Sequence, residues 1–282
     1  MEEYEIPKGS KLYFGDSAKL KRSIENNASV LLEKNGFKEI ITPYFLNTNI
    51  ATDKQNTIQT STENNKFLSL RPDSTIEVLR LALNRIDNKI KKWFYIQPIF
   101  SYPSNEEYQI GIEYIDFNDI SYVLDILASL LEPYQIKYTL QISNINIVNL
   151  LIKKYKIKKE FLSPLNLESL LNSKINWISK LAHIQKIEDL QELDIYPQDI
   201  KDELIILKQS ISNMPKHDNI KEHIVIEPLY FDELKYYESV YFRAFSGNTL
   251  LAKGGIYKDS GVISSGFAIY TDHLLNKILQ KG

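Results

Sequence analysis

Apolar residues recur at helical spacing near the start of the chain and then give way to short strand patterns. A helix is predicted over residues 17–35, with Asp16 as its N-cap and Gly36 at its end. Its apolar stripe has a spacing of three or four residues and consists of Leu20, Ile24, Ala28 and Leu31. A short strand is predicted at Ile40-Ile41, and the polar residues 52–65 predict a loop or a hairpin with weak strands.

The middle of the chain alternates between strand and helix patterns. Residues 93–100 and 110–117 are rich in aromatic and β-branched side chains, so they predict two strands, with the polar segment 101–109 as a long loop between them. Ser74 and Glu77 have the spacing of a capping box, which predicts the start of a helix. Further elements are predicted as helices over 119–131 and 145–154 and a strand over 136–142.

A helical insert interrupts the strand pattern at residues 163–214, where leucine and isoleucine recur at three and four with charges between them. Strand patterns then return over 224–231, 236–245, 249–253 and 262–270, and a last helix is predicted from Asp272. Several strands follow one another through hairpin-like loops, which favours an antiparallel sheet flanked by helices. We therefore predict an α+β fold, with a single domain over residues 1–282 that contains the insert.

Composition and charge narrow the classes of function. The 282 residues are 43% hydrophobic and carry a net charge of −2, which suits a globular protein with a sizeable core and argues against a general nucleic-acid binder. The absence of cysteine from the sequence excludes disulfides and cysteine-based metal sites or nucleophiles. The acidic N-terminus lacks the apolar stretch of a signal peptide, so we expect a cytoplasmic location without a membrane segment. The four histidines have no metal-ligand spacing, and no metal site is expected.

Several short motifs in a defined order carry the candidate chemistry. They are GFKEIITP at 36–43, LRPDST at 70–75, QIGIE at 109–113, LKYYESVYF at 234–242, KGGIY at 253–257 and SGFAIY at 265–270. In this order they resemble the core of the class II aminoacyl-tRNA synthetases, and specifically the histidyl enzyme. The resemblance covers nearly the whole chain and implies the class II fold, in which helices flank an antiparallel sheet.

The resemblance also implies a pocket for an amino acid. The residues that match the family's pocket, where they hold the amino group and imidazole of histidine, are Asp73, Thr75, Gln109, Glu113, Tyr236 and Tyr237. Two carboxylates and an amide beside aromatic rings suit a cationic amino group and a ring N–H. Asp73 is one methylene shorter than the family's glutamate, and Lys235 and Glu238 replace the family's aspartate and threonine. The identity of the ligand therefore stays open.

The same motifs have structural interpretations. Ser74 and Glu77 can serve only as a helix cap, and Tyr236-Tyr237 can equally be ordinary strand packing. Gly254-Gly255 is interpreted as a turn that permits close backbone approach, because no lysine or helix cap of a phosphate-binding loop follows it. The spacing of Gln109 and Glu113 places both on one face of a strand, which favours the pocket interpretation.

The arginines that activate the amino acid with ATP in the family are missing at three positions. Ser101 stands where motif 2 has its arginine, Asp272-His273 stands for the Glu-Arg of motif 3, and residues 231–233 contain no arginine. The arginines of this chain are Arg22, Arg71, Arg80, Arg85 and Arg243. Each lost arginine is expected to weaken transition-state stabilisation by about 3 kcal/mol or more, by analogy with other preorganised donors. We therefore expect no catalytic residues, no cofactor and no enzymatic activity.

A synthetase-like core without these arginines is similar to one known group, the regulatory subunits of ATP phosphoribosyltransferase in histidine biosynthesis. Proteins of that group also lack the anticodon-binding domain of the synthetases. We expect none in this protein, and therefore no tRNA charging. The resemblance implies a homodimer through the motif 1 region, histidine as ligand and a short-form catalytic subunit as partner. Two alternatives stay open: a stand-alone paralogue that senses another small molecule, and an active amino-acid ligase.

Overall fold

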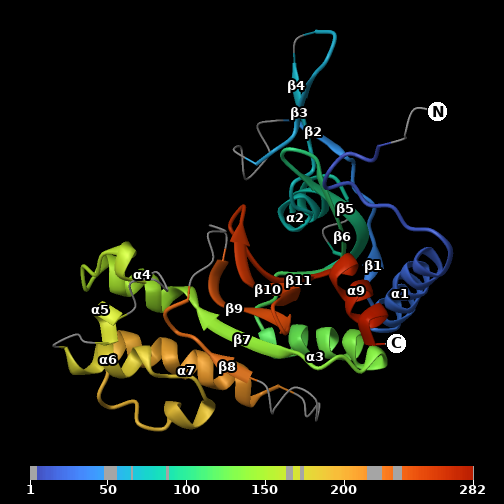
Figure 1. Ribbon diagram of the computed structural model, residues 1–282. Coiled ribbons are helices and arrows are strands. Elements are labelled where there is room, and N and C mark those ends of the chain that lie inside the picture. Colours follow the sequence, from blue (N-terminus) through green and yellow to red (C-terminus); the bar gives the residue numbers. More distant parts are fainter. Residues whose placement is uncertain are drawn as a thin grey trace. The chain divides into compact units, whose positions relative to one another are not determined.

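A computed structural model describes residues 5–47, 56–64, 66–86, 89–162, 168–171, 175–214, 224–230 and 237–281 (Figure 1). The chain divides into two compact units, each with its own internal contacts. Unit 1 comprises Met1–Ile115 and Ala268–Gly282, and unit 2 comprises Asp116–Phe267. Our expectation of one synthetase-like domain over the whole chain stays a prediction.

The main sheet of unit 1 is built around a long antiparallel hairpin. Strand β5 (Lys92–Ser101) pairs with β6 (Asn105–Ile115) from Lys92 opposite Tyr114 to Ser101 opposite Asn105, and β1 (Lys38–Glu39) runs parallel to β5. The predicted long loop over 101–109 is therefore wrong, because only residues 102–104 separate the two strands. The first half of β6 is polar and only partly buried, so it has no apolar alternation from which a strand could be predicted.

A small second sheet in unit 1 has the strand order β2-β4-β3, and both pairs are antiparallel. Its strands are β2 (Phe45–Asn47), β3 (Gln59–Ser61) and β4 (Phe67–Leu70). The polar residues around β3 thus form the weak strand that was one of the two sequence predictions for 52–65. The strand predicted at Ile40-Ile41 lies earlier in the structure, where β1 begins at Lys38.

Helices α1 (Gly15–Lys34), α2 (Thr75–Asn84) and α9 (Thr271–Lys281) complete unit 1, where α1 and α9 lie side by side (Figure 1). Helix α1 begins one residue before Asp16, so the predicted N-cap is wrong. Instead, Phe14 precedes the first turn, and its backbone N–H donates to Ser17 Oγ at 3.1 Å. The predicted end is right, because Gly36 adopts a φ of +81° directly after Asn35, the C-cap residue of the helix, and glycine tolerates this conformation best.

The sheet of unit 2 has the neighbour order β11-β10-β9-β7-β8, and all of its strand pairs whose register is defined are antiparallel except β7 with β8. Its strands are β7 (Thr139–Asn144), β8 (Ile224–Ile226), β9 (Tyr237–Ser246), β10 (Thr249–Asp259) and β11 (Val262–Tyr270), of which β11 ends in unit 1. The turn predicted at Gly254-Gly255 is wrong, because both glycines lie inside β10. Their function is close packing: a Cβ on Gly254 would come within 2.3 Å of Gly266 O, and one on Gly255 within 2.5 Å of Tyr241 Cβ.

The helices of unit 2 are α3 (Ile120–Leu131), α4 (Ile145–Lys153), α5 (Glu168–Leu171), α6 (Asn176–Ala182) and α7 (Gln198–Ser212). Short 3₁₀ turns lie at Glu132–Tyr134, Lys159–Leu162 and Ile187–Leu190. Within the described part of the predicted insert, residues 168–171 and 175–214 contain helices and turns but no strand, as predicted.

Helix α7 attaches the insert to the rest of unit 2 by packing on α4 and β7. The Glu203 carboxylate accepts a hydrogen bond from Asn144 Nδ2 at 2.8 Å, and Asp199 accepts one from Tyr155 at 2.7 Å. The insert therefore packs on its own chain.

The architecture confirms the predicted fold class, an α+β fold with a mostly antiparallel sheet flanked by helices. Among the described residues, no helix combines the length and the apolar character that crossing a bilayer requires.

Candidate functional site

One face of the β5–β6 hairpin carries the polar residues that the sequence singled out. In the register, Tyr95 lies opposite Gly111, Gln97 opposite Gln109, and Trp93 opposite Glu113. Directly paired residues of antiparallel strands point to the same face. Gln109 and Glu113 are four residues apart on β6 and share this face, in agreement with their spacing in the sequence.

This face is deeply buried although it is polar. Gln109 is 2% exposed and Glu113 is fully buried. Buried polar groups are nearly always hydrogen-bonded, and a buried carboxylate is retained when it has a cationic or hydrogen-bonding partner. A buried polar face of this kind is typical of a site that binds a polar ligand.

Tyr95 belongs to the same site, and the sequence analysis missed it. Its ring lies across Gly111, where a Cβ would be only 2.2 Å from Tyr95 Cζ. The available signal was Gly111 itself, because a glycine inside a strand often marks the close approach of another group. The strand pattern over residues 93–100 marks Tyr95 only as one of several aromatic residues.

Asp73, Thr75 and Glu113 all lie close enough to the Tyr95 hydroxyl to influence its ionisation. Burial is the largest cause that raises the pKa of Tyr95, followed by the negative charges of Glu113 and then of Asp73, while Thr75 opposes the change. The phenol is therefore neutral at physiological pH. Three residues predicted from the sequence, Asp73, Thr75 and Glu113, thus gather around one buried tyrosine within unit 1, and Gln109 shares its face of the hairpin.

The turn that carries Asp73 and Thr75 is positioned by a network different from the predicted capping box. Ser74 is the N-cap residue of α2, but its Oγ accepts a hydrogen bond from Gln97 Nε2 at 3.0 Å and does not cap the helix. Glu77 accepts a hydrogen bond from Thr42 Oγ1 at 3.1 Å. Asp73 Oδ1 takes over the capping role at the long distance of 3.4 Å from the Ile76 N–H. The predicted helix start is right, while the predicted capping partners are wrong because tertiary contacts engage both side chains.

Arg71 is the centre of this network. It is fully buried, and its Nη1 donates to the backbone oxygens of Thr42 at 2.9 Å and Pro43 at 3.1 Å, while its Nε donates to Pro98 O at 3.1 Å. Burial lowers the pKa of Arg71, and the nearby Glu77 carboxylate opposes that change. Burial also raises the pKa of Glu77 to about 7, against the opposing effects of Thr42 and Arg71. The two groups thus connect the turn before α2 to the motif 1 segment and to β5.

The two predicted tyrosines are a different case. Tyr236 lies outside the described residues. Tyr237 begins β9 in unit 2, where it is 8% exposed and its ring stacks on Tyr241 at 5.1 Å between ring centres. Gly255 leaves the space for this stack, because a Cβ there would lie 2.9 Å from the Tyr237 ring. A role for either tyrosine in ligand binding stays a prediction.

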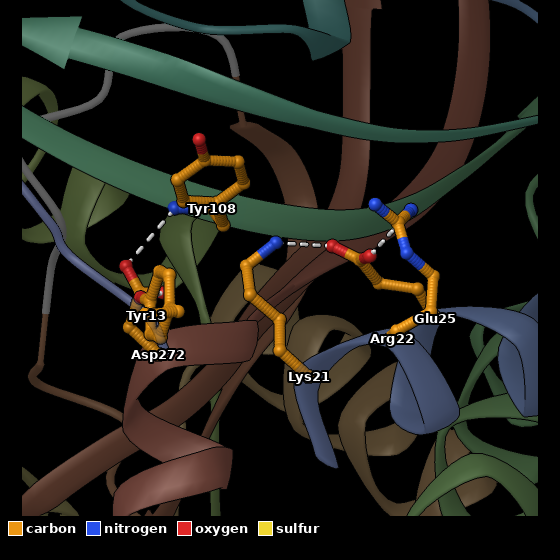
Figure 2. A network of polar contacts seen from close by, with 6 residues as sticks. All are labelled: Tyr13, Lys21, Arg22, Glu25, Tyr108 and Asp272. Atoms are coloured by element: carbon orange, nitrogen blue, oxygen red, sulfur yellow. Dashed lines mark hydrogen bonds and ion pairs between the residues drawn. The ribbon is translucent and has the colours of Figure 1, made fainter. Parts of the chain in front are cut away.

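The opposite face of β6 carries a second polar cluster, which Figure 2 shows. Asp272, 4% exposed at the start of α9, accepts hydrogen bonds from the Tyr13 hydroxyl and, at 3.1 Å, from the Tyr108 N–H. Lys21 Nζ lies 3.7 Å from the centre of the Tyr108 ring and forms an ion pair with Glu25. Burial, followed by the hydrogen bond to Asp272, raises the pKa of Tyr13 far above its usual value, so its hydroxyl stays protonated and donates.

The structure describes two of the positions where the motif resemblance leads us to expect an arginine in a synthetase. Ser101 is the last residue of β5. Asp272 fastens α9 to β6 and to the segment before α1, and the His273 ring stacks on Tyr270 at 5.2 Å between ring centres. Residues 231–233 lie outside the described part of the chain.

Comparison with known proteins identifies the family. Residues 14–274 match the family described as histidyl-tRNA synthetase. The ATP phosphoribosyltransferase regulatory subunit of Wolinella succinogenes is 36% identical, with 99% of this chain and 97% of that protein covered. The protein of the same name from Helicobacter hepaticus is 38% identical, with 98% and 99% covered.

Solved structures agree on the fold. An ATP phosphoribosyltransferase regulatory subunit/histidyl-tRNA synthetase from Bacillus halodurans superimposes with a TM-score of 0.85 at 18% identity, covering 99% of this chain and 84% of that one. The histidyl-tRNA synthetase from Nostoc gives a TM-score of 0.79 at 15% identity, covering 100% and 77%. At these identities the likeness concerns the fold alone. By its similarity to curated relatives over nearly its full length, the chain belongs to the family of ATP phosphoribosyltransferase regulatory subunits, within the histidyl-tRNA synthetase-like proteins.

Proposed function

We propose that the protein is a non-catalytic regulatory subunit of ATP phosphoribosyltransferase in histidine biosynthesis, which binds histidine and thereby controls a short-form catalytic subunit. The observation that carries the proposal is the gathering of Asp73, Thr75 and Glu113 around the buried Tyr95 hydroxyl, with Gln109 on the same face. This gathering supports the proposal that the amino-acid half of a synthetase-like site is retained.

The chemistry of this group of residues favours an amino acid. Carboxylates accept hydrogen bonds and carry negative charge, and the Gln109 carbonyl accepts as well. An α-ammonium group has three N–H donors and a positive charge, so it matches such surroundings. A ring N–H of histidine adds a further donor. Physical complementarity therefore supports a small cationic amine with additional N–H donors as the ligand.

The cations of the chain support the absence of ATP activation. The Arg71 guanidinium donates hydrogen bonds to backbone carbonyls, and Arg22 forms an ion pair with Glu25 at 3.3 Å. Arg243 stacks at 3.6 Å on the Tyr230 ring and donates to Gln141 Oε1 at 2.7 Å. Phosphoryl charge in a transition state needs fixed cations at defined points. Ser101 and Asp272-His273 provide none of the arginines of the synthetase motifs.

The motif 1 region is a surface suited to a second copy of the chain. Ile41 is 77% exposed, and Tyr44 and Phe45 are each more than half exposed within the same short stretch. Phe45 lies on β2, an edge strand of the small sheet. Exposed apolar side chains beside an edge strand commonly mark an interface. We expect light scattering to give the mass of a dimer at micromolar concentration, and a monomer would contradict this part of the proposal.

Two measurements test the function. Isothermal titration calorimetry of the purified chain should detect histidine binding, and purification from the native host should recover an ATP phosphoribosyltransferase catalytic subunit. Binding of another amino acid in place of histidine would favour the stand-alone sensor that Lys235 and Glu238 suggest. Amino-acid-dependent exchange of pyrophosphate into ATP would contradict the non-catalytic assignment.

A further inference from the structure

The face of the β5–β6 hairpin that carries Tyr95, Gln109 and Glu113 is the proposed ligand face. Two buried polar atoms on this ligand face have no hydrogen-bond partner within the described residues. They are the Tyr95 hydroxyl, on a residue that is 0% exposed, and Oε1 of Gln109, which is 2% exposed. Thr75 lies near the Tyr95 hydroxyl, but the contact lacks the geometry of a hydrogen bond. Buried polar atoms in native proteins are nearly always satisfied, and each exception calls for an explanation such as a water, an ion or a ligand. The Tyr95 hydroxyl lies near the acidic side chains of Asp73 and Glu113, and Gln109 is on the same face of the hairpin, so a ligand is the explanation that fits their place.

The fold by itself does not require the Tyr95 hydroxyl. The ring fills the space over Gly111, and a phenylalanine would fill that space equally well without burying a hydroxyl. An unmatched buried hydroxyl is destabilising, so packing alone would favour phenylalanine at this position. The hydroxyl therefore has a use other than packing.

The surrounding charges define what the hydroxyl faces. Glu113 and Asp73 both place negative charge near it, and both raise its pKa in addition to the larger effect of burial. A ligand carboxylate would be repelled here, whereas a cation would be attracted. Gln109 Oε1 can only accept a hydrogen bond, and the Tyr95 oxygen can accept one as well. Surroundings made of acceptors and negative charge suit an ammonium group with several N–H donors.

We propose that Tyr95 is a ligand-contacting residue whose hydroxyl oxygen accepts a hydrogen bond from the ammonium group of the bound amino acid. This inference rests on the proposed function and adds to it a specificity determinant for a free amino group. Asp73 and Thr75 are partly exposed, while Gln109, Glu113 and Tyr95 are buried.

The test compares Tyr95→Phe with the wild-type chain in two measurements. The melting temperature without ligand should be unchanged or higher in Y95F, because the variant no longer buries an unmatched hydroxyl. Histidine affinity measured by calorimetry should fall about tenfold or more, since a hydrogen bond to a charged group is lost. Tyr102→Phe is the matched control, because Tyr102 is 66% exposed in the turn between β5 and β6, and it should change neither quantity.

A second ligand makes the test specific for the ammonium group. Imidazolepropionate, which is histidine without its amino group, should bind more weakly than histidine to the wild type, and Y95F should not weaken it further. Equal histidine affinity in Y95F and the wild type would overturn the inference while leaving the proposed function intact. A weaker affinity accompanied by a melting temperature several degrees lower would also overturn it, in favour of a structural role. If none of the twenty amino acids binds the wild-type chain, both the inference and the proposed function fail.

Discussion

Strand β6 carries Gln109 and Glu113 on one face and Tyr108 on the other, and the two faces use their polar groups differently. On the first face, the Gln109 and Tyr95 side chains include buried polar atoms without a partner in the described structure. On the second face, both oxygens of the buried Asp272 carboxylate are engaged, one by Tyr13 and one by the Tyr108 N–H. The first face has polar atoms left to bind a ligand. On the second face, Tyr13, Tyr108 and Asp272 form an internal cluster, the Asp272 clamp, in which both carboxylate oxygens already have donors.

This difference between the two faces of β6 matches the division between amino-acid binding and ATP activation that the sequence motifs suggested. By the motif resemblance, we expect the positions around Asp73 and Glu113 to correspond to the amino-acid half of a synthetase site. Asp272 stands in the motif that contributes to ATP activation in synthetases, and here it joins α9 to β6 and to the segment before α1. Asp272 thus has structural contacts within the described residues, which is compatible with the proposed protein that binds an amino acid without activating it.

The largest expected effect comes from removing the support of the ligand face. Arg71→Met leaves the carbonyls of Thr42, Pro43 and Pro98 without their donor and the buried Glu77 without its cation. Breaking a buried charge network of this kind costs about 3–5 kcal/mol, so the free energy of unfolding in urea should fall by that amount. Histidine binding should be lost with it, because the turn with Asp73 and Thr75 is no longer anchored.

The exposed Arg85, at the end of α2, provides the control for this change. Arg85→Met should alter the free energy of unfolding by less than about 0.5 kcal/mol, as is usual for surface substitutions. An Arg71→Met variant within about 1 kcal/mol of the wild type, by the same urea measurement, would show that the network does not hold the ligand face.

The second prediction concerns pH and the same network. The pKa of Glu77 is raised from 4.5 to about 7 in the folded chain, so folding favours its protonated form. Its contribution to stability is therefore fully present below about pH 4.5 and is lost as the pH rises to about 7. The upper limit of this loss is about 3 kcal/mol, because a difference of one in pKa between the folded and unfolded chain corresponds to about 1.4 kcal/mol.

The Glu77→Gln variant isolates this contribution. Its side chain does not titrate, so its free energy of unfolding relative to the wild type should increase when urea unfolding is repeated from pH 5 to pH 8. A constant difference between the two proteins over that range would mean that Glu77 ionises normally in the folded state.

Sequence patterns predicted much of the ligand face but little of the opposite one. Gln109 and Glu113 were assigned to one face because strand periodicity depends only on neighbours along the chain. Tyr95 was missed because its importance depends on lying opposite Gly111 across the hairpin, and the predicted loop between the strands was too long to define that register. Local spacing also suggested the Ser74–Glu77 capping box, which contacts with Gln97 and Thr42 override.

The clamp on the opposite face could not have been predicted, because its partners are far apart along the chain. Tyr13 and Asp272 are separated by 259 residues and meet only after α1, β6 and α9 have packed together. Motif comparison drew attention to Asp272 as a residue that replaces a glutamate. It contained no information on which group the carboxylate contacts.

The third prediction tests whether the clamp is structural. Asp272→Ala removes the acceptor of both the Tyr13 hydroxyl and the Tyr108 N–H, so the free energy of unfolding should fall by about 2 kcal/mol. Asp272→Asn keeps one acceptor oxygen and should lose less. Histidine affinity should stay within about twofold of the wild type in both variants, because the cluster lies on the other face of β6. A large loss of affinity at unchanged stability would assign Asp272 to the ligand site.

The smallest expected effect comes from Lys21, at the edge of the same cluster. Lys21→Met keeps most of the side-chain stem but removes the charge over the Tyr108 ring and the ion pair with Glu25. Cation–π contacts and partly buried ion pairs each contribute little, so a loss of about 1 kcal/mol in the free energy of unfolding is expected.

Lys19→Met, on the exposed side of α1, is the control and should have almost no effect. The Lys21 side chain is only 12% exposed, so the loss should persist at high salt, where exposed pairs are screened. A loss that disappears in salt would reduce Lys21 to a surface charge and confine the clamp to Tyr13, Tyr108 and Asp272.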